Sequence, residues 1–542
     1  MKNTLYYGDN LDILRNHIKD ESIDLIYLDP PFNSKASYNI LFKEPSGKLS
    51  EAQITAFDDA WHWTSETEKT FSEIVKSAPA QVIEMMRSFR QFIGMNDMMA
   101  YLTMMCIRLL ELRRVLKETG SIYLHCDPTA SHYLKILMDS IFGKNNFRNE
   151  ITWKRKTGRG ETQHKSNKFG VCTDIVLFYS KTQNNFFEAQ FNYQAAGYQN
   201  YVDKFFTYKD ENGRRYCIDN LASPSPRPNL MYEYKGYKPP KNGWAISKEK
   251  MEQWDKEGRL HYPESKEGRI RRKRYLDELK GKPVQNLWDD IEMISSQAAE
   301  RLGYPTQKPE ALLDRIINTS SREGDLILDP FCGCGTTISV AQRMNRRWIG
   351  IDITHLAINL IKWRLKDMFA LEPRKDYMVV GEPEDHAGAR DLFALNRYQF
   401  QWWATSLINA KPYGEKKKGA DTGIDGHLFF SDEEGQYKKA VVQVKGGKVE
   451  VSDIRDLGHV IEREKSEIGI FITLEPPTRQ MSKEALEKGY YHSDFLNKDY
   501  LRLQILTIEE LLRGKQPDIP SVSSFIKKAP IVNMSPTQEL DL

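Results

Sequence analysis

The chain has 542 residues, enough for three or four domains of the usual size of about 150 residues. Its formal net charge is only +3, from 78 basic and 75 acidic residues, which excludes a global basic field that would attract nucleic acid by itself. The six cysteines form no CxxC pair and no zinc spacing, so we expect reduced thiols. Neither a signal peptide nor a run of about 18 apolar residues occurs, so we expect a soluble cytoplasmic protein.

Two short strands are predicted near the amino terminus. The first leads into Tyr6-Tyr7-Gly8-Asp9-Asn10, where Asp9 can cap a helix that starts near Leu11. The second is the apolar run 24–28, which ends in Asp29-Pro30-Pro31-Phe32. Open α/β sheets bind ligands beyond the carboxyl ends of their parallel strands, and this loop offers a carboxylate, two rigid prolines and an aromatic face at that position.

The next part of the chain mixes helices with two further strands. Residues 51–116 are predicted to be helical, and the Met-rich face of residues 98–116 is expected in the core. Strands are predicted at 120–125 and 173–179. Residues 181–300 are rich in Tyr, Lys, Arg and Pro and lack the alternation of strand and helix, so an insert is expected there.

A second apolar run followed by a loop lies in the region 301–366, where the strand–helix alternation resumes. Residues 326–328 lead into Asp329-Pro330-Phe331-Cys332-Gly333-Cys334-Gly335-Thr336-Thr337. The glycines let the backbone approach a bulky ligand, and the two threonines start a helix. The next apolar run, 347–351, ends in Asp352, a carboxylate about 20 positions further on that suits ribose hydroxyls, as in dinucleotide-binding folds.

Together, the Asp-Pro-Pro-Phe loop and the glycine loop resemble those of the DNA amino-methyltransferases, which use S-adenosylmethionine to methylate an exocyclic amine. The catalytic motif precedes the cofactor motif, which is the permuted order of the β class of that family. The resemblance implies an α/β, S-adenosylmethionine-dependent methyltransferase (Rossmann-like) fold with helical and target-recognition inserts. It also implies double-stranded DNA as a partner, and because dimers are common in the β class, a homodimer is one possible state.

The resemblance assigns several residues to the cofactor. The glycine loop would contact the methionine moiety, and residues 304–309 resemble the segment that opens the helix beside the cofactor pocket. Asp9 lies in a segment that resembles the one near the cofactor adenine, so it either binds the cofactor or only caps its helix. The predicted cofactor-binding residues are Asp9, Thr306, Lys308, Asp329, Phe331, Gly333, Gly335, Thr336 and Asp352.

The predicted catalytic residues are Asp29, Pro30, Pro31 and Phe32. An adenine N6 amine is a poor nucleophile because its lone pair is delocalised into the ring. The Asp29 side chain and the Pro30 carbonyl can accept its hydrogens, and Phe32 can stack on the base once it has left the duplex. Since cytosine-N4 members more often begin this loop with Ser, we expect adenine N6, with cytosine N4 as the alternative. In the family the strand 120–125 helps to form the base pocket, so Asp127 is a candidate supporting residue.

Two basic clusters lie between the catalytic and cofactor motifs, where this family inserts its DNA-reading region. Basic runs are usually solvated faces, but this position favours phosphate binding. The predicted DNA-binding residues are Lys154, Arg155 and Lys156 in one cluster, and Arg269, Arg271, Arg272, Lys273 and Arg274 in the other.

The predicted boundaries follow from these segments. They are a catalytic half at 1–180 with a helical insert at about 45–116, a target-recognition insert at 181–300, a cofactor half at 301–370, a charged linker at 371–388 and a further domain at 389–542.

The carboxyl-terminal domain resembles the PD-(D/E)XK restriction-endonuclease core in its Mrr-like variant. A Mg²⁺ nuclease of this kind needs a carboxylate for the metal (Asp425), a neighbouring acceptor (Gln443) and a cation near the attacking water (Lys445). Strand alternation places the last two on one face. Related nucleases commonly carry a glutamate on the preceding helix, but residues 398–403 contain no acid. Weak Mg²⁺ binding at Asp425 and DNA binding without cleavage therefore both remain open.

Three functions remain open at this stage. The first is a DNA adenine methyltransferase of a restriction–modification or phage-defence system, acting alone or with other restriction or defence subunits, whose last domain only assists DNA engagement. The second is a single-chain enzyme that also cleaves DNA with Mg²⁺. The third is a DNA-binding scaffold with degenerate loops, and the intact Asp29 loop and glycine loop count against it.

Overall fold

The computed structural model describes residues 2–31, 37–43, 49–58, 62–156, 169–192, 198–295, 298, 300–302, 304, 306–412, 423–433, 436–494 and 496–520. The chain divides into two compact units. One contains Met1–Glu188 together with Asn286–Leu542, and the other contains Ala189–Gln285. The second unit falls inside the range 181–300, where the sequence predicts an insert.

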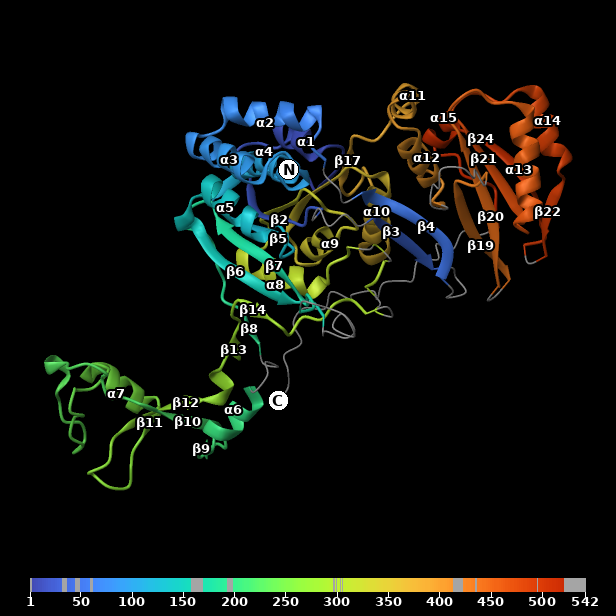
Figure 1. Cartoon of the computed structure of the whole chain (residues 1–542). Coiled ribbons are helices and arrows are strands. Elements are labelled where there is room, and N and C mark those ends of the chain that lie inside the picture. The colour runs from blue at the N-terminus through green and yellow to red at the C-terminus, as the bar shows by residue number, and fades with distance from the viewer. Residues whose placement is uncertain are drawn as a thin grey trace. The chain divides into compact units, whose positions relative to one another are not determined.

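A nine-stranded sheet forms the centre of the larger unit (Figure 1). Only β7 runs antiparallel to its two neighbours, and every other adjacent pair is parallel. The strands, in spatial order, are β14 (Leu287–Trp288), β6 (Phe147–Lys154), β7 (Thr173–Ser180), β5 (Leu116–Cys126), β2 (Ile23–Leu28), β15 (Leu326–Asp329), β16 (Arg347–Asp352), β1 (Thr4–Tyr7) and β17 (Met378–Val380).

The central strands are apolar runs because both of their faces are covered. Every residue of β15 is buried, and so are five of the six residues of β2. These two strands are neighbours, with Leu25 opposite Ile327. Parallel neighbours end at the same edge of a sheet, so the loops that follow Leu28 and Asp329 begin side by side although about 300 residues separate them in the chain.

Helices cover both faces of this sheet. The helices α1 to α5 share one apolar cluster with β2, β5 and β15, and the methionines Met99 and Met105 of α4 are fully buried in it, as expected. On the other face, Ser320 of α8 lies 2.7 Å from the Tyr123 hydroxyl of β5. The helices are α1 (Asn10–His17), α2 (Ser65–Ser77), α3 (Ala80–Ile93), α4 (Asp97–Val115), α5 (Ser131–Phe142), α8 (Glu310–Ser320), α9 (Thr336–Arg343) and α10 (His355–Phe369).

Two segments differ from the expectations. Part of the stretch 51–116, predicted to be helical, belongs to strand β4 (Leu49–Asp58), because an antiparallel partner, β3 (Ser37–Lys43), supplies its backbone hydrogen bonds. The stretch 371–388, expected as a linker, contains β17, which extends the sheet by pairing with β1. Gly381 directly follows β17, and a side chain there would meet the Tyr7 carbonyl, so the chain leaves the sheet in close contact with it.

The smaller unit is a compact α+β module with an aromatic interior. Its four-stranded sheet has the order β11-β12-β10-β9, and a separate two-stranded sheet pairs β13 with β8. Trp244, Tyr234 and Tyr237 are buried together in its core. The elements are β8 (Phe191–Asn192), α6 (Tyr198–Phe205), β9 (Tyr208–Lys209), β10 (Arg215–Asn220), α7 (Lys248–Lys256), β11 (Leu260–His261), β12 (Arg271–Tyr275) and β13 (Lys282–Pro283).

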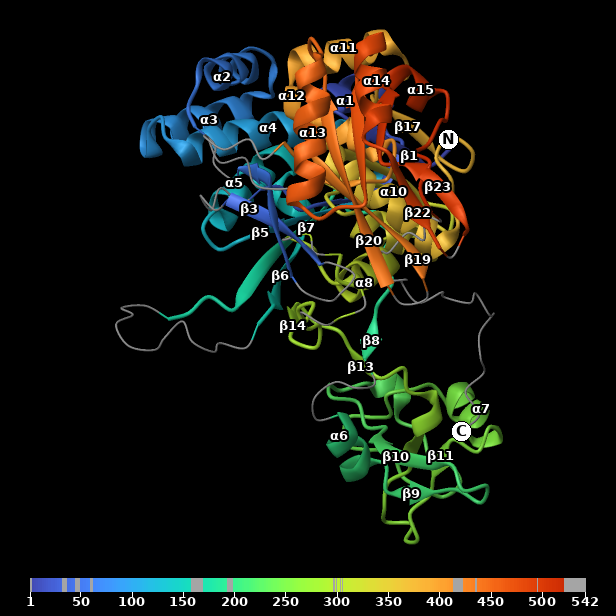
Figure 2. The ribbon, with the colours of Figure 1, turned by 90° about the vertical axis from the view of Figure 1, so that its right-hand side faces the viewer.

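A second α/β sheet, of five strands in the order β18-β19-β20-β21-β24, forms the carboxyl-terminal domain. Both α12 and α13 pack against this sheet (Figure 2). Alternate residues of β20 face opposite apolar clusters: Val442 and Val444 pack with α12, whereas Val441 packs with α13. The elements are α11 (His386–Leu395), α12 (Arg397–Ser406), β18 (Lys411–Pro412), β19 (Gly426–Glu433), β20 (Gln436–Lys445), α13 (Val451–Arg463), β21 (Ile468–Thr473), α14 (Arg479–Glu487), β22 (Tyr490–Ser493), β23 (Lys498–Leu501), β24 (Leu503–Thr507) and α15 (Ile508–Leu512).

The two sheets confirm the predicted fold class, a Rossmann-like α/β fold with inserts followed by a smaller α/β domain. Among the helices within the described ranges, none is both long and apolar enough to cross a bilayer.

Candidate functional site

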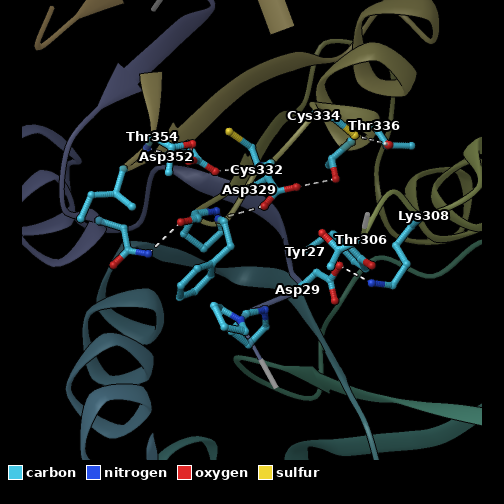
Figure 3. Close-up of a pocket in the computed structure, with 18 of the residues that line it drawn as sticks. Tyr27, Asp29, Thr306, Lys308, Asp329, Cys332, Cys334, Thr336, Asp352 and Thr354 are labelled. Carbon is cyan, nitrogen blue, oxygen red and sulfur yellow. Dashed lines mark hydrogen bonds and ion pairs between the residues drawn. The ribbon is translucent and has the colours of Figure 1, made fainter. Parts of the chain in front are cut away.

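A cavity of about 310 Å³ lies where β1, β2, β15 and β16 end (Figure 3). It contains most of the residues that the sequence assigns to the catalytic and cofactor sites, while Gly335 lies next to the lining residues Cys334 and Thr336. The sequence-predicted residues that line it are Asp9, Asp29, Pro30, Pro31, Thr306, Lys308, Asp329, Phe331, Gly333, Thr336 and Asp352.

Asp29 is the first residue after β2, and its two carboxylate oxygens have different surroundings. Lys308 donates a hydrogen bond to Oδ2, and the two side chains are only 14% and 11% exposed (Figure 3). Oδ1 is buried and has no hydrogen-bond partner among the described residues. The carboxylate therefore offers one oxygen as an acceptor. Phe32, predicted to stack on a base, lies outside the described residues.

Lys308 is the first difference between the expected and observed sites. The sequence places it among the cofactor-binding residues, but its ammonium contacts the Asp29 carboxylate. The loop 304–309 reaches the end of β2 because α8 begins at Glu310, beside the cavity. No local sequence signal connects the two residues, which are 279 positions apart.

The glycine loop begins at the buried Asp329. Its carboxylate accepts hydrogen bonds from the Thr337 hydroxyl (2.5 Å) and from the Phe331 amide (3.1 Å). Burial raises the pKa of Asp329 to about 7, against the effect of these two bonds.

Both glycines of this loop have backbone conformations that favour glycine, with φ of 48° at Gly333 and 75° at Gly335. A side chain at Gly333 would meet Tyr304 at 3.2 Å, and one at Gly335 would meet Ile361 at 2.6 Å. Glycine is therefore required both for the turn and for the close packing that leaves the cavity open.

Asp352 ends β16, and its carboxylate fixes two loops. One oxygen accepts the Gly333 amide (2.9 Å), and the other accepts the amide and hydroxyl of Thr354 (2.9 and 2.8 Å). Burial raises the pKa of Asp352 to about 6, although these bonds act in the opposite direction.

Asp9 has a structural role in addition to its place in the cavity wall. Its side chain accepts the Leu11 amide at 2.7 Å and caps α1, and Arg108 donates to both of its oxygens at 2.8 and 3.0 Å. These bonds support the capping alternative directly, and because Asp9 also lines the cavity, its role in cofactor binding stays a prediction.

Beneath Asp29 lies a buried polar chain that the sequence did not predict. The Tyr27 hydroxyl is 3.0 Å from Nδ1 of His125, and Nε2 of His125 is 3.2 Å from the Asp174 carboxylate. His125 is fully buried. Burial acts to raise the pKa of Asp174, but His125 and Arg155 lower it overall, which favours the ionised carboxylate beside Nε2.

Asp127, the predicted supporting residue, is not a member of this polar network. The Asp127 side chain accepts the amides of Thr129 and Ala130 and so shapes the turn before α5. His125, the last residue of the predicted strand 120–125, is the member of this segment that reaches Tyr27. The sequence signal that could have identified His125 was its place at the end of a predicted apolar strand.

The two basic clusters occupy different units. In the larger unit, Arg155 lies 3.1 Å from Asp174, and Lys154 is exposed. Lys156 follows at the end of the described stretch.

In the smaller unit, three of the five basic residues on or next to β12 pack against other side chains. Arg272 lies over Trp254 and Lys273 over Tyr216, while Arg274 donates to the Tyr201 hydroxyl. Arg269 and Arg271 are exposed. These two are therefore better placed than the other three to reach a phosphate.

The predicted nuclease residues are neighbours on β20 and at the start of β19. Gly426 pairs with Val442, so Asp425 lies beside Gln443. One Asp425 oxygen accepts the Val444 amide at 2.7 Å, and Lys445 is paired with Asp453 of α13 at 2.5 Å. Among the residues that the structure describes, the buried carbonyl oxygen of Gln443 has no hydrogen-bond partner.

This donor set does not fit Mg²⁺. The ion usually requires octahedral oxygen coordination, with carboxylates as its protein ligands. Asp425 supplies one carboxylate, and Lys445, expected near the attacking water, is held by Asp453 instead. Within the described ranges, no group of three or more His, Cys, Asp or Glu residues is placed to hold a metal.

Comparison with known proteins gives two family matches. The family model N6_N4_Mtase, described as DNA methylase, matches residues 23–362. A second model, described as NACHT-associated inactive Restriction Endonuclease 1, matches residues 395–512. The carboxyl-terminal domain thus matches a restriction-endonuclease-like family, as the sequence predicts, but one described as inactive.

Individual relatives are similar over the first two thirds of the chain. Type II methyltransferase M.EcaI of Enterobacter cloacae is 28% identical over 70% of this chain and 72% of its own length. The type III restriction-modification enzyme StyLTI Mod subunit of Salmonella typhimurium is 26% identical over 63% of this chain, which spans about half (50%) of that subunit. The solved structure of an M1.HpyAVI–SAM complex is 15% identical, with 67% of this chain and 98% of that chain covered and a TM-score of 0.31.

Proposed function

Because the chain belongs to the DNA methylase family, we propose that it transfers a methyl group from S-adenosylmethionine to the N6 amine of adenine in DNA. The supporting observation is the unpartnered oxygen of Asp29 in the same cavity as the glycine loop. This arrangement offers an amine acceptor and a cofactor cradle within one cavity.

The residues present fit S-adenosylmethionine. A volume of about 310 Å³ is within the range of small-molecule sites, and Gly333 presents backbone without a side chain at the cavity wall. Asp352 would accept the ribose hydroxyls, and the loop from Asp329 would hold the methionine moiety. When bound, the cofactor supplies an electrophilic methyl group on its sulfonium.

Asp29 would act on the amine of the target base. Its free Oδ1 and the Pro30 carbonyl would accept the two amine hydrogens and turn the nitrogen lone pair towards the methyl donor. Lys308 would fix the carboxylate through Oδ2, and the chain from Tyr27 to Asp174 would hold the strand end beneath it. Since a base inside the duplex cannot reach this cavity, the adenine must be flipped out of the helix.

The choice of N6 over N4 rests on the Asp at position 29, since the family model includes both amine types. Purified protein is incubated with DNA and labelled S-adenosylmethionine, and the digested nucleosides are identified by mass spectrometry. We expect N6-methyladenine. Finding N4-methylcytosine alone would refute the choice of base while leaving the methyltransferase assignment intact.

The role of Asp29 has its own test. Asp29→Ala should lower transfer by about a hundredfold or more, because a positioned acceptor is lost, while binding of S-adenosylhomocysteine stays close to that of the unchanged protein. Near-normal turnover in Asp29→Ala would mean that the catalytic loop is elsewhere.

We further propose that the carboxyl-terminal domain does not cleave DNA. The donor set around Asp425 and the match to a family described as inactive support this. The similarity to a Mod subunit, which by its name is part of a type III restriction-modification enzyme, supports a role beside other restriction subunits. The exposed Arg269 and Arg271 and the cluster at Lys154 are the surfaces that we propose for DNA phosphates.

A further inference from the structure

The helix that lacks the nuclease glutamate contacts the cofactor half of the larger unit. One face of α12 is buried in its own domain through Phe400, Trp403 and Ala404. Gln399 and Trp402 lie three positions apart and so share another face of the helix. Both are close to α10, which begins directly after the Asp352 loop.

Gln399 completes the amino-terminal turn of α10. The first amides of a helix have no acceptor inside it, and the amide of the fully buried His355 is one of these. The Gln399 side-chain carbonyl accepts this amide at 3.2 Å. The preceding residue, Thr354, is the one that donates twice to Asp352. Gln399 therefore fixes the backbone one residue from the ribose-binding loop.

Trp402 supports another part of the cavity wall. It packs against an apolar cluster that contains Tyr304, Cys334 and Leu356. Tyr304 is the ring closest to Gly333, and Cys334 belongs to the glycine loop itself. A third contact from the same domain, between the Trp363 indole and Asn409 at 3.2 Å, continues the interface along α10.

We propose that α12 of the nuclease-like domain is a positioning element for the cofactor site, with Gln399 and Trp402 holding the Asp352 loop and Tyr304 in their binding geometry. The inference rests on the proposed function, because it takes the cavity to be the S-adenosylmethionine site. It gives the domain a function that needs neither a metal nor cleavage. It also predicts that the two domains are not independent, since the nuclease-like domain supplies contacts on two sides of the cavity.

The test compares full-length variants by calorimetry with S-adenosylhomocysteine. Gln399→Ala and Trp402→Ala should each raise Kd about threefold to tenfold, because a buried amide loses its acceptor in one and the cavity wall loses its packing in the other. The value of kcat at saturating cofactor should stay unchanged, because neither residue contacts Asp29. Gln399→Glu, which keeps an acceptor oxygen, should restore most of the affinity.

Ser406→Ala is the matched control on the same helix. Within the described part of the chain, its hydroxyl donates only to the Trp403 carbonyl of α12, so the substitution should leave Kd unchanged. A second measurement follows hydrogen exchange at residues 352–357, which should lose protection in Gln399→Ala without a change in melting temperature of the whole protein.

The outcomes separate this inference from the proposed function. Unchanged Kd and unchanged exchange in both Gln399→Ala and Trp402→Ala would overturn the inference and leave the function standing. If the unaltered protein does not bind S-adenosylhomocysteine, the proposed function fails, while the exchange measurement still decides whether α12 holds the loop. Equal losses of affinity in Ser406→Ala and Gln399→Ala would show general weakening of the domain and would also overturn the inference.

Discussion

Replacement of Lys308 by methionine separates two roles for this residue. The sequence places Lys308 with the cofactor, whereas its ammonium contacts Asp29. Methionine keeps an apolar stem of similar reach and removes the charge. The side chains of the pair are 11% and 14% exposed, so solvent screens it only weakly. A hydrogen bond to a charged group in such a setting contributes about 1.5–3 kcal/mol, which corresponds to about tenfold to a hundredfold in rate.

We therefore expect Lys308→Met to lower kcat by that factor and to leave the Kd for S-adenosylhomocysteine within about twofold. Methyl incorporation measures kcat, and calorimetry measures Kd. Lys117→Met is the control, because Lys117 forms a comparable pair with Asp24 at 2.7 Å near the amino-terminal end of β2, away from the cavity. The reasoning is refuted if Kd rises while kcat is unchanged, since Lys308 would then serve the cofactor.

Two further predictions concern the carboxylates. Asp352→Ala should raise the Kd for S-adenosylhomocysteine about tenfold to a hundredfold with near-normal kcat at saturation, and an unchanged Kd in calorimetry would place the ribose elsewhere. An ionised carboxylate is the better acceptor for the ribose hydroxyls. Affinity should therefore fall as the pH is lowered through the pKa of Asp352, about 6, and a flat profile between pH 8 and pH 5 would contradict this assignment. For the carboxyl-terminal domain, we expect that plasmid incubated with the protein and millimolar Mg²⁺ or Mn²⁺ stays uncut. Cleavage that disappears in Asp425→Ala and Lys445→Ala, with methylation unaffected, would restore the nuclease interpretation.

The sequence was most informative where one segment carries its own signal. Apolar runs that end in Asp29, Asp329 and Asp352 predicted three strands and the sheet edge that gathers them, because burial on both faces requires such runs. Strand β20 of the nuclease-like domain was likewise predicted from its own apolar run. These features are local, so no partner had to be known in advance.

The contacts that the sequence missed join distant segments. The ion pair between Lys308 and Asp29, the chain from Tyr27 to Asp174, and the bond from Gln399 to His355 each depend on which strands and helices become neighbours. A single polar residue in a strand or helix does not identify its partner. Strand β17 was missed for a related reason: a three-residue edge strand within a charged stretch has almost no periodicity to detect.

The place of β1 in the sheet has a consequence for synthesis of the chain. Thr4 pairs on one side with Ile349 and on the other with Met378. Once made, β1 therefore has neither neighbour until roughly 340 residues more are made, which takes about 20–70 s at ordinary elongation rates. During that interval its backbone groups are unpaired, and the sheet can close only after β16 and β17 emerge. Closure of this sheet is accordingly a late step in synthesis, and β1 is the strand of the sheet whose partners arrive after the longest delay.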